Sequence, residues 1–414
     1  MNIKFRLTIL NFFEFFVFGS WLISLGGYLG GQLHFSGAQI GKIFMTLGLA
    51  SIIMPAIVGI IADKYLNAQK LLGIIHILGA GFLFYLSLIN DYDTFFWVML
   101  AYLMLYMPTI GLANAVSYSV LEDNNYDIVK VFPPIRVWGT IGFIIAMWII
   151  DFLDWTQSPN QFYFAAVFSL LLGIYSFTLP NVPCSTSKSK SLTERLGLDA
   201  FVLFKEYKMA VFFIFSMLLG VVLQISNAWA SEFLRSFTAD FPDSFAVKHS
   251  NILISLSQIS ETIFILTIPF FLKKFGIKAV MLMSMFTWFL RFFLFGIGNP
   301  EGIGLAYLTV SMIVYGMAFD FFNISGSLFV ENETDPKFRS SAQGLFILLT
   351  NGLGALIGGY TSGLIVDHYT NNNGDRDWNS IWFIFAGYAL LLTIVFALIF
   401  KYKHKPEAIK DINH

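Results

Sequence analysis

The sequence has very little cysteine. Cys184 is the only one in 414 residues, so an intramolecular disulfide, a cluster of thiolate metal ligands and a cysteine redox pair are all excluded. The chain also lacks a recognisable Ser/His/Asp set, a metal-ligand cluster and a phosphate-binding glycine loop. We therefore expect no enzyme, no cofactor and no metal site.

Charged residues are scarce as well. They make up 12% of the chain, whereas hydrophobic residues make up 57% and phenylalanine alone occurs 47 times. Soluble proteins carry about 25% charged residues. No basic patch with interleaved aromatic residues lies outside the apolar runs, so nucleic acid is not an expected partner. The composition predicts a protein whose main surroundings are membrane lipid.

Apolar runs long enough to cross a hydrocarbon core, about 20 residues each, recur along the whole chain. The first run follows Lys4 and Arg6 without a signal-peptide cleavage site, so we interpret it as a retained helix. Breaks at polar, glycine, proline and charged clusters predict twelve spans, near 7–32, 37–61, 69–90, 94–121, 132–153, 160–180, 208–235, 248–272, 276–298, 302–330, 338–366 and 379–400.

A long polar stretch divides these spans six and six. It predicts an all-α membrane protein with an N-terminal six-helix bundle (1–180), a flexible linker (181–207) and a C-terminal six-helix bundle with a short tail (208–414). This layout resembles that of major facilitator transporters. Lysine and arginine gather in the loops on one side of the membrane, and only Lys42, Arg235, Lys248 and Arg376 lie in the opposite loops. The positive-inside rule then places both termini and the linker in the cytoplasm.

A few ionisable residues lie inside the predicted spans, where a charge costs at least about 2.5 kcal/mol. They are Glu14, His76, Arg136, Glu261, Arg291 and Asp320. Glu261 and Asp320 fall near the middle of spans eight and ten, the depth of coupling sites in transporters, which suggests proton carriers. A permanent ion pair of either carboxylate with Arg136 or Arg291 is the alternative.

The other ionisable residues are less informative. Arg291 lies near the outer end of its span, which favours snorkelling to the interface or a structural ion pair over substrate contact. His76 is expected to be structural. Glu14 fits either a second proton site or a cavity-lining acceptor, and the sequence leaves both open.

Neutral polar and aromatic residues follow the charges at helical spacing. Gln224 and Asn227 share a face of span seven, and Gln258 precedes Glu261 by three residues on span eight. Hydrogen bonds between helices are the alternative for each amide.

Two further stripes carry residues of the same kinds. Thr140 and Phe143 continue the stripe of Arg136 on span five, and Tyr315 and Phe319 lie one turn apart on span ten. Such aromatic rings can stack on a planar base, although simple packing explains any one of them equally well. Amides, carboxylates and ring faces together suit a planar base joined to a hydroxylated sugar.

Several segments resemble the nucleoside:proton symporter family. They are 132–140 (FPPIRVWGT), 196–201 (LGLDAF), 215–220 (FSMLLG), 257–262 (SQISET), 311–316 (SMIVYG), 319–327 (FDFFNISGS) and 341–344 (SAQG). The resemblance covers nearly the whole chain. It implies a twelve-helix major facilitator that imports purine and pyrimidine nucleosides, such as uridine and adenosine, with protons across a bacterial inner membrane, and that works as a monomer.

The resemblance also implies a set of site residues. The matching positions for substrate are Arg136, Thr140, Phe143, Gln224, Asn227, Gln258, Glu261, Tyr315, Phe319 and Asp320. Glu261 and Asp320 would combine ribose recognition with proton coupling. Glu14 departs from the family pattern, in which an uncharged amide is expected at this position. The number of carboxylates that take part in coupling is therefore left open. A carrier of oligosaccharides or other hydroxylated solutes is the second interpretation, since six-plus-six symporters share this layout.

Overall fold

The computed structural model describes residues 2–184 and 196–403. Helices account for all its regular elements apart from one isolated bridge between Thr370 and Arg376. The α-helices are α1 (Ile3–Gly19), α2 (Leu25–Gly31), α3 (Gly37–Lys64), α4 (Ala68–Leu86), α5 (Tyr92–Asp123), α6 (Ile128–Phe152), α7 (Asn160–Ser176), α9 (Tyr207–Ser236), α10 (Phe245–Lys248), α11 (Ser250–Ile265), α12 (Ile268–Ile297), α13 (Gly302–Ala318), α14 (Asp320–Glu333), α15 (Arg339–Ile347), α16 (Ala355–His368) and α17 (Trp378–Ile399). A 3₁₀ helix η1 (Leu198–Lys205) and a π-helical segment η2 (Leu348–Gly354) complete them.

Nine helical segments in the described part of the chain are long and apolar enough to cross a membrane. The other three predicted spans correspond to α1 with α2, to α7, and to α11 with the start of α12. Each predicted span therefore coincides with helix, but several are interrupted. Span one breaks between Gly19 and Leu25, span ten at Phe319, and span eleven contains η2.

Gly276 separates spans eight and nine. Its φ of 79° and ψ of 169° interrupt α12, and such a positive φ is readily adopted only by glycine. The predicted loop at Lys273–Lys274 comes immediately before this turn, so the chain changes direction with almost no connecting residues. Because the connection is so short, the adjoining ends of the two spans are held close together.

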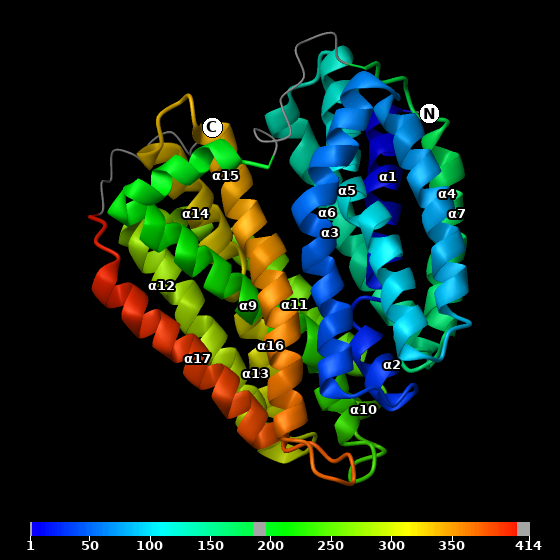
Figure 1. Ribbon diagram of the computed structural model, residues 1–414, viewed down its shortest axis with the longest axis vertical. Helices are drawn as coiled ribbons and strands as arrows, with labels where there is room; N and C mark the ends of the chain where they lie inside the picture. Colours follow the sequence, from blue (N-terminus) through cyan, green and yellow to red (C-terminus); the bar gives the residue numbers. More distant parts are fainter. Residues whose placement is uncertain (1, 185–195, 404–414) are drawn as a thin grey trace.

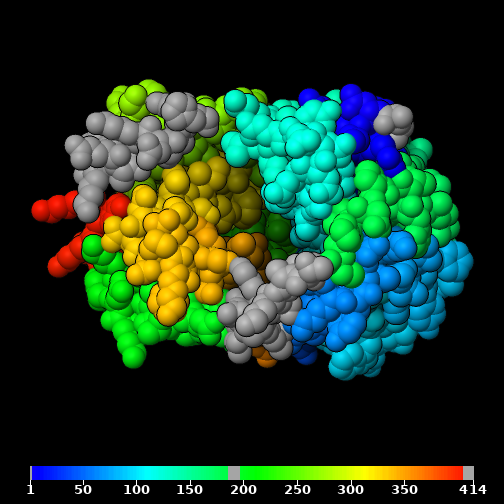
Figure 2. All heavy atoms as spheres, turned by 90° about the horizontal axis from the view of Figure 1, so that it is seen from above, coloured from blue at the N-terminus to red at the C-terminus, as the bar shows by residue number. Residues whose placement is uncertain are grey.

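The helices form two bundles that meet along α3 and α16 (Figure 1). We call the face where α1 begins and α15 lies the upper face, and the face with α2 and α10 the lower face, as they stand in Figure 1. Viewed from the upper face, the surface is hollowed between the two bundles (Figure 2). The two bundles are thus open towards the upper face.

Glycines let α3 and α16 meet closely near the lower face. A Cβ atom added to Gly41 would lie 2.4 Å from the carbonyl oxygen of Gly359 and 2.8 Å from the Cα of Gly363. No side chain larger than hydrogen fits there without moving the backbone. Small residues that allow such backbone contact are typical of helix interfaces in membranes.

A buried carboxylate fastens the bundles on the same face. Asp151, at the end of α6, is 3% exposed and accepts hydrogen bonds from the backbone N–H of Asn251 (2.8 Å) and Ile252 (3.1 Å) at the start of α11. Its other oxygen lies 2.9 Å from Nδ1 of His249. Because a carboxylate stabilises the positive end of a helix, Asp151 acts as an N-terminal cap supplied by the opposite bundle.

The predicted linker is only partly described. Residues 185–195, with its serines and lysines, lie outside the described residues. Within the remainder, η1 is folded, and Ala200 and Leu203 are buried. The expectation of a flexible segment is therefore wrong for Leu198–Lys205, because its apolar side chains pack against the C-terminal bundle beside α9 and α15.

We predict that Asp151→Asn loosens the lower face. The amide loses the charge, and it offers one acceptor oxygen in place of two. A loss of about 1.4 kcal/mol corresponds to a tenfold shift in an equilibrium. In detergent-solubilised protein carrying Cys184→Ser and Ala228→Cys, we expect a maleimide to label the buried Cys side chain about tenfold faster after Asp151→Asn. Ala228 is suitable because it is fully buried where α9 meets Gly26 of α2.

Asp243→Asn provides the matched control. Asp243 is also an aspartate near the lower face, but its partner is Lys248 at 2.7 Å and both side chains are largely exposed. A hydrogen bond from Lys248, together with its charge, holds the pKa of Asp243 below its usual value. Labelling should be unchanged by this substitution. Equal labelling rates for Asp151→Asn and the parent would show that the cap does not hold the face closed.

Candidate functional site

The two central carboxyls lie in contact within the C-terminal bundle. Glu261 is on α11, and Asp320 is the first residue of α14, next to the interruption at Phe319. Their side chains are hydrogen-bonded to each other. A hydrogen bond between two carboxyls needs a proton, because two carboxylate ions have only acceptors to offer. The pair is thus arranged to hold one proton in common.

Arg136 approaches this pair from the N-terminal bundle. It lies on α6, half-buried, with its guanidinium 3.9 Å from the centre of the Phe15 ring. Its charge interacts with Glu261 across the two bundles and with Glu14 in its own bundle. Within the described residues, Arg136 forms no ion pair with either central carboxyl, so the permanent ion pair that was the alternative is absent in this conformation.

Three predicted residues line one small pocket between the bundles. Asn227 on α9, Gln258 on α11 and Tyr315 on α13 meet there, and Ile23 of the N-terminal bundle closes it. The Oε1 atom of Gln258 is buried without a hydrogen-bond partner among the described residues. Two amides and a phenol on three helices therefore converge beside Glu261, which follows Gln258 by one helical turn.

Arg291 lines the same pocket, and both expectations for it are wrong. It is 1% exposed, so it does not snorkel, and it forms no ion pair with a described residue. Instead its Nε donates to the Ser226 hydroxyl (3.1 Å), and its Nη1 donates to the Ser257 hydroxyl (3.2 Å) and the Ser311 carbonyl (2.9 Å). The Tyr315 ring lies over the guanidinium at 4.7 Å. Sequence spacing could not identify these neutral partners, because they come from three other helices.

The remaining predicted residues are dispersed. Gln224 is buried and donates to the Phe44 carbonyl of α3 at 3.3 Å, which is the helix-to-helix bond considered as its alternative. Phe143 is buried against Phe18 of α1. Thr140 and Phe319 are both half-buried, and Phe319 lines a second small pocket with Asn323. In this conformation these side chains contribute to the packing of the bundles rather than to a single shared cavity.

A larger cavity than these two pockets lies elsewhere. It has a volume of about 610 Å³, opens at the lower face and is lined by Glu232, Arg235 and Arg376, with none of the predicted site residues. Arg376 forms an ion pair with Glu232. Because none of the predicted site residues lines this cavity and Arg376 is already paired with Glu232, we place the chemistry at the central carboxyls and not here.

Comparisons with known proteins agree with this arrangement. Residues 1–405 match the family model described as nucleoside H⁺ symporter. The chain is 52% identical over 413 residues to the xanthosine permease of Escherichia coli, covering 99% of both chains. It is 49% identical over 419 residues to the nucleoside permease NupG of the same organism, covering 100% of both. These relatives are permeases and not enzymes, as predicted.

Solved structures extend the comparison to the fold. A crystal structure of NupG matches with a TM-score of 0.92 and 50% identity, covering 97% of this chain and 100% of that one. An auto-inhibited POT family peptide transporter matches with a TM-score of 0.70 at 13% identity, covering 98% of both, which concerns the fold alone. The predicted all-α major facilitator fold of two six-helix bundles is confirmed. The chain belongs to the nucleoside H⁺ symporter family and is a multi-pass membrane transporter.

Proposed function

We propose that this transporter imports purine and pyrimidine nucleosides with protons, using the carboxyl pair of Glu261 and Asp320 as the coupling group. The observation that carries the proposal is the hydrogen bond between these two carboxyls. The names of the relatives, a nucleoside permease and a xanthosine permease, support the substrate class.

Proton coupling follows from the surroundings of the pair. Asp320 is 8% exposed, and an isolated charge at that depth is costly. When the site hydrates or a nucleoside arrives, the shared proton can leave or a second one can enter. The ribose hydroxyls are suited to this exchange because each can both donate to a carboxylate and accept from a carboxyl. The binding of the nucleoside is thereby linked to the binding of the proton.

The base is held by the residues around the pair. Asn227 and Gln258 offer amide donors and acceptors to the edge of a base, and Tyr315 and Phe319 offer ring faces. Arg136, Thr140 and Phe143 face from α6, and Gln224 joins the site when its bond to the Phe44 carbonyl opens. Closure of the bundles around the nucleoside brings these dispersed residues together.

The orientation rests on the basic loops. With most lysines and arginines at the upper face, both termini and the hollow lie on the cytoplasmic side. The closed lower face, with Asp151 and the glycines of α3, then faces the periplasm across a bacterial inner membrane. The chain divides at 181–207 into two bundles that rock about the central site, and one chain is sufficient for transport.

The first prediction of this proposal concerns substrate and driving force. Vesicles containing the protein should take up labelled uridine faster with an imposed inward proton gradient than without it, because proton entry drives nucleoside entry. Unlabelled adenosine and thymidine should compete, and lactose should not. Competition by lactose alone would keep the fold and reject the substrate class.

The second prediction concerns Asp320. In Asp320→Asn the pair can no longer exchange its proton, since an amide does not titrate. Accumulation of uridine against its gradient should fall by about tenfold per pH unit, which is the contribution of the one proton that the pair exchanges. The measurement is the equilibrium ratio of uridine inside and outside proteoliposomes at a fixed pH difference.

Asp93→Asn is the matched control, because Asp93 is an exposed aspartate in the first turn of α5. It should accumulate uridine like the parent. Size-exclusion chromatography of both variants establishes that they are folded. Undiminished accumulation by Asp320→Asn would remove this residue from the coupling group.

A further inference from the structure

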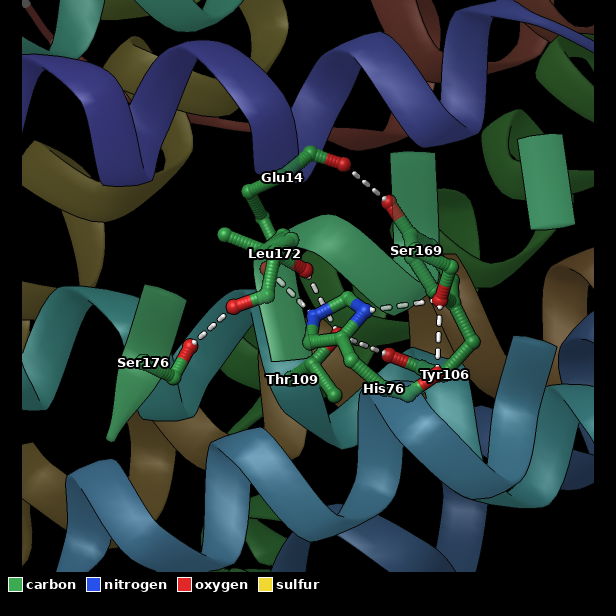
Figure 3. A network of polar contacts seen from close by, with 7 residues as sticks. All are labelled: Glu14, His76, Tyr106, Thr109, Ser169, Leu172 and Ser176. Atoms are coloured by element: carbon green, nitrogen blue, oxygen red, sulfur yellow. Dashed lines mark hydrogen bonds and ion pairs between the residues drawn. The ribbon is translucent and has the colours of Figure 1, made fainter. Parts of the chain in front are cut away.

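The N-terminal bundle contains a second buried acid and base. Glu14 on α1 is 0% exposed and His76 on α4 is 1% exposed. The Nε2 atom of His76 lies 2.9 Å from Oε2 of Glu14. Figure 3 draws the two side chains and their neighbours. Neither residue belongs to the central site, and the expectation that His76 is merely structural did not include an acidic partner.

The hydrogen bonds around His76 determine where its protons lie. The Ser169 hydroxyl donates to the backbone carbonyl of His76 at 2.9 Å, and its oxygen lies 3.2 Å from Nδ1 of the same residue (Figure 3). Since a carbonyl can only accept and the hydroxyl has a single hydrogen, the Ser169 oxygen accepts from Nδ1–H. Nδ1 is therefore protonated.

This assignment leaves one labile proton between His76 and Glu14. If the imidazole is neutral, Nε2 carries a lone pair and Glu14 must supply the proton of the 2.9 Å contact. If the imidazole is charged, Nε2–H donates to the carboxylate. Without that proton, two lone pairs would face each other. At the contact between Nε2 and Oε2, both permitted states hold one proton.

We propose that Glu14 and His76 form a second proton-binding site of the transporter, so that each bundle carries one. The proposal rests on the proton coupling proposed above and assigns its stoichiometry: one proton at the central carboxyls and one in the N-terminal bundle. Release of the second proton leaves a net negative charge on the Glu14–His76 pair.

The neighbours of Glu14 make this charge consequential. On α5, the Thr109 hydroxyl lies 2.6 Å from Oε1 of Glu14 and 2.5 Å from the Tyr106 carbonyl, so its single hydrogen serves either oxygen. The Tyr106 hydroxyl donates to the Glu14 carbonyl at 2.7 Å, and Tyr102 is near enough to interact electrostatically. On α6, Arg136 interacts with Glu14 through its charge. The helix α7 contributes the neutral Ser169. Arg136 is thus the cation of this group that is charged in every state.

Charge balance links the two sites through Arg136. The central pair with one shared proton carries a charge of −1, which Arg136 balances, and the protonated Glu14–His76 pair is neutral. When that pair loses its proton, two negative sites compete for one guanidinium. Because a buried group of charges is stable only when compensated, occupancy of the Glu14–His76 site controls how strongly Arg136 holds Glu261 across the bundles.

The test is the number of protons that accompany each nucleoside. Purified protein is reconstituted into liposomes with the membrane potential held at zero by potassium and valinomycin. The equilibrium accumulation ratio of uridine is then measured against the imposed pH difference. Two coupled protons give about a 100-fold change per pH unit, and one gives about tenfold. We expect the first slope for the parent and the second for Glu14→Gln.

Glu122→Gln is the matched control, because Glu122 lies in the same bundle but is exposed at the end of α5. It should keep the parent slope. If Glu14→Gln fails to fold, as judged by size-exclusion chromatography and a uridine-dependent melting temperature, His76→Gln is measured in its place, with the same expected slope.

A parent slope of tenfold, or a parent slope retained by Glu14→Gln, overturns the second site while leaving proton-coupled transport intact. A parent that does not respond to the pH difference overturns both proposals. A merely structural role for Glu14 would lower the amount of folded protein without changing the slope, so it is distinguished from proton binding.

Discussion

Two carboxyls that share a hydrogen bond in a membrane interior must hold a proton, and the arrangement of the central site depends on this requirement. Glu261 and Asp320 belong to the same bundle. Arg136, whose charge interacts with Glu261, belongs to the other bundle. Rocking of the bundles changes the distance from Arg136 to Glu261 and leaves the carboxyl pair together. The electrostatic surroundings of the shared proton therefore differ between the two open states. This difference is what a coupled transporter needs, because proton binding and conformation must each affect the other.

The helix interruptions explain why these groups can occupy the middle of the membrane. Backbone irregularity is tolerated at that depth only where it is buried in protein or lines a cavity. The interruption at Phe319 immediately precedes Asp320, and the π-helical segment η2 packs against α9 and α3, where the two bundles meet. Gly276 has a different role, because it permits a sharp turn between two spans. The continuous helix α17 carries no comparable break, and it contributes none of the predicted site residues.

The spans, the two bundles and the family could be predicted from the sequence, because hydropathy and family motifs are properties of local stretches of chain. The sequence also selected Glu261 and Asp320 as candidates, since carboxylates are conspicuous in apolar runs, and the structure places the two side chains together. The sequence was insufficient for Arg291, whose partners are three serines on other helices, and for His76, whose partner Glu14 lies 62 positions away. These partners depend on which helices pack together and at which rotation, and a periodic pattern fixes only the face of one helix. For the same reason the sequence left open whether Gln224 and Phe143 lie at the carboxyl pair or pack between helices, and the structure shows the second arrangement.

The free energy that a proton gradient supplies is similar in size to that of the hydrogen bonds that hold the lower face closed. One pH unit contributes about 1.4 kcal/mol for each proton that enters, so two protons supply about 2.7 kcal/mol. A hydrogen bond to a charged group contributes about 1.5–3 kcal/mol, and Asp151 makes two such bonds across the lower face in addition to its contact with His249. Opening that face therefore requires a free energy that an ordinary gradient can supply only when the upper face gains compensating contacts. In the proposed site the nucleoside supplies these contacts, because Arg136 belongs to one bundle and Glu261 and Asp320 belong to the other. A much stronger latch would trap the transporter open to one side, and a much weaker one would let protons pass without substrate.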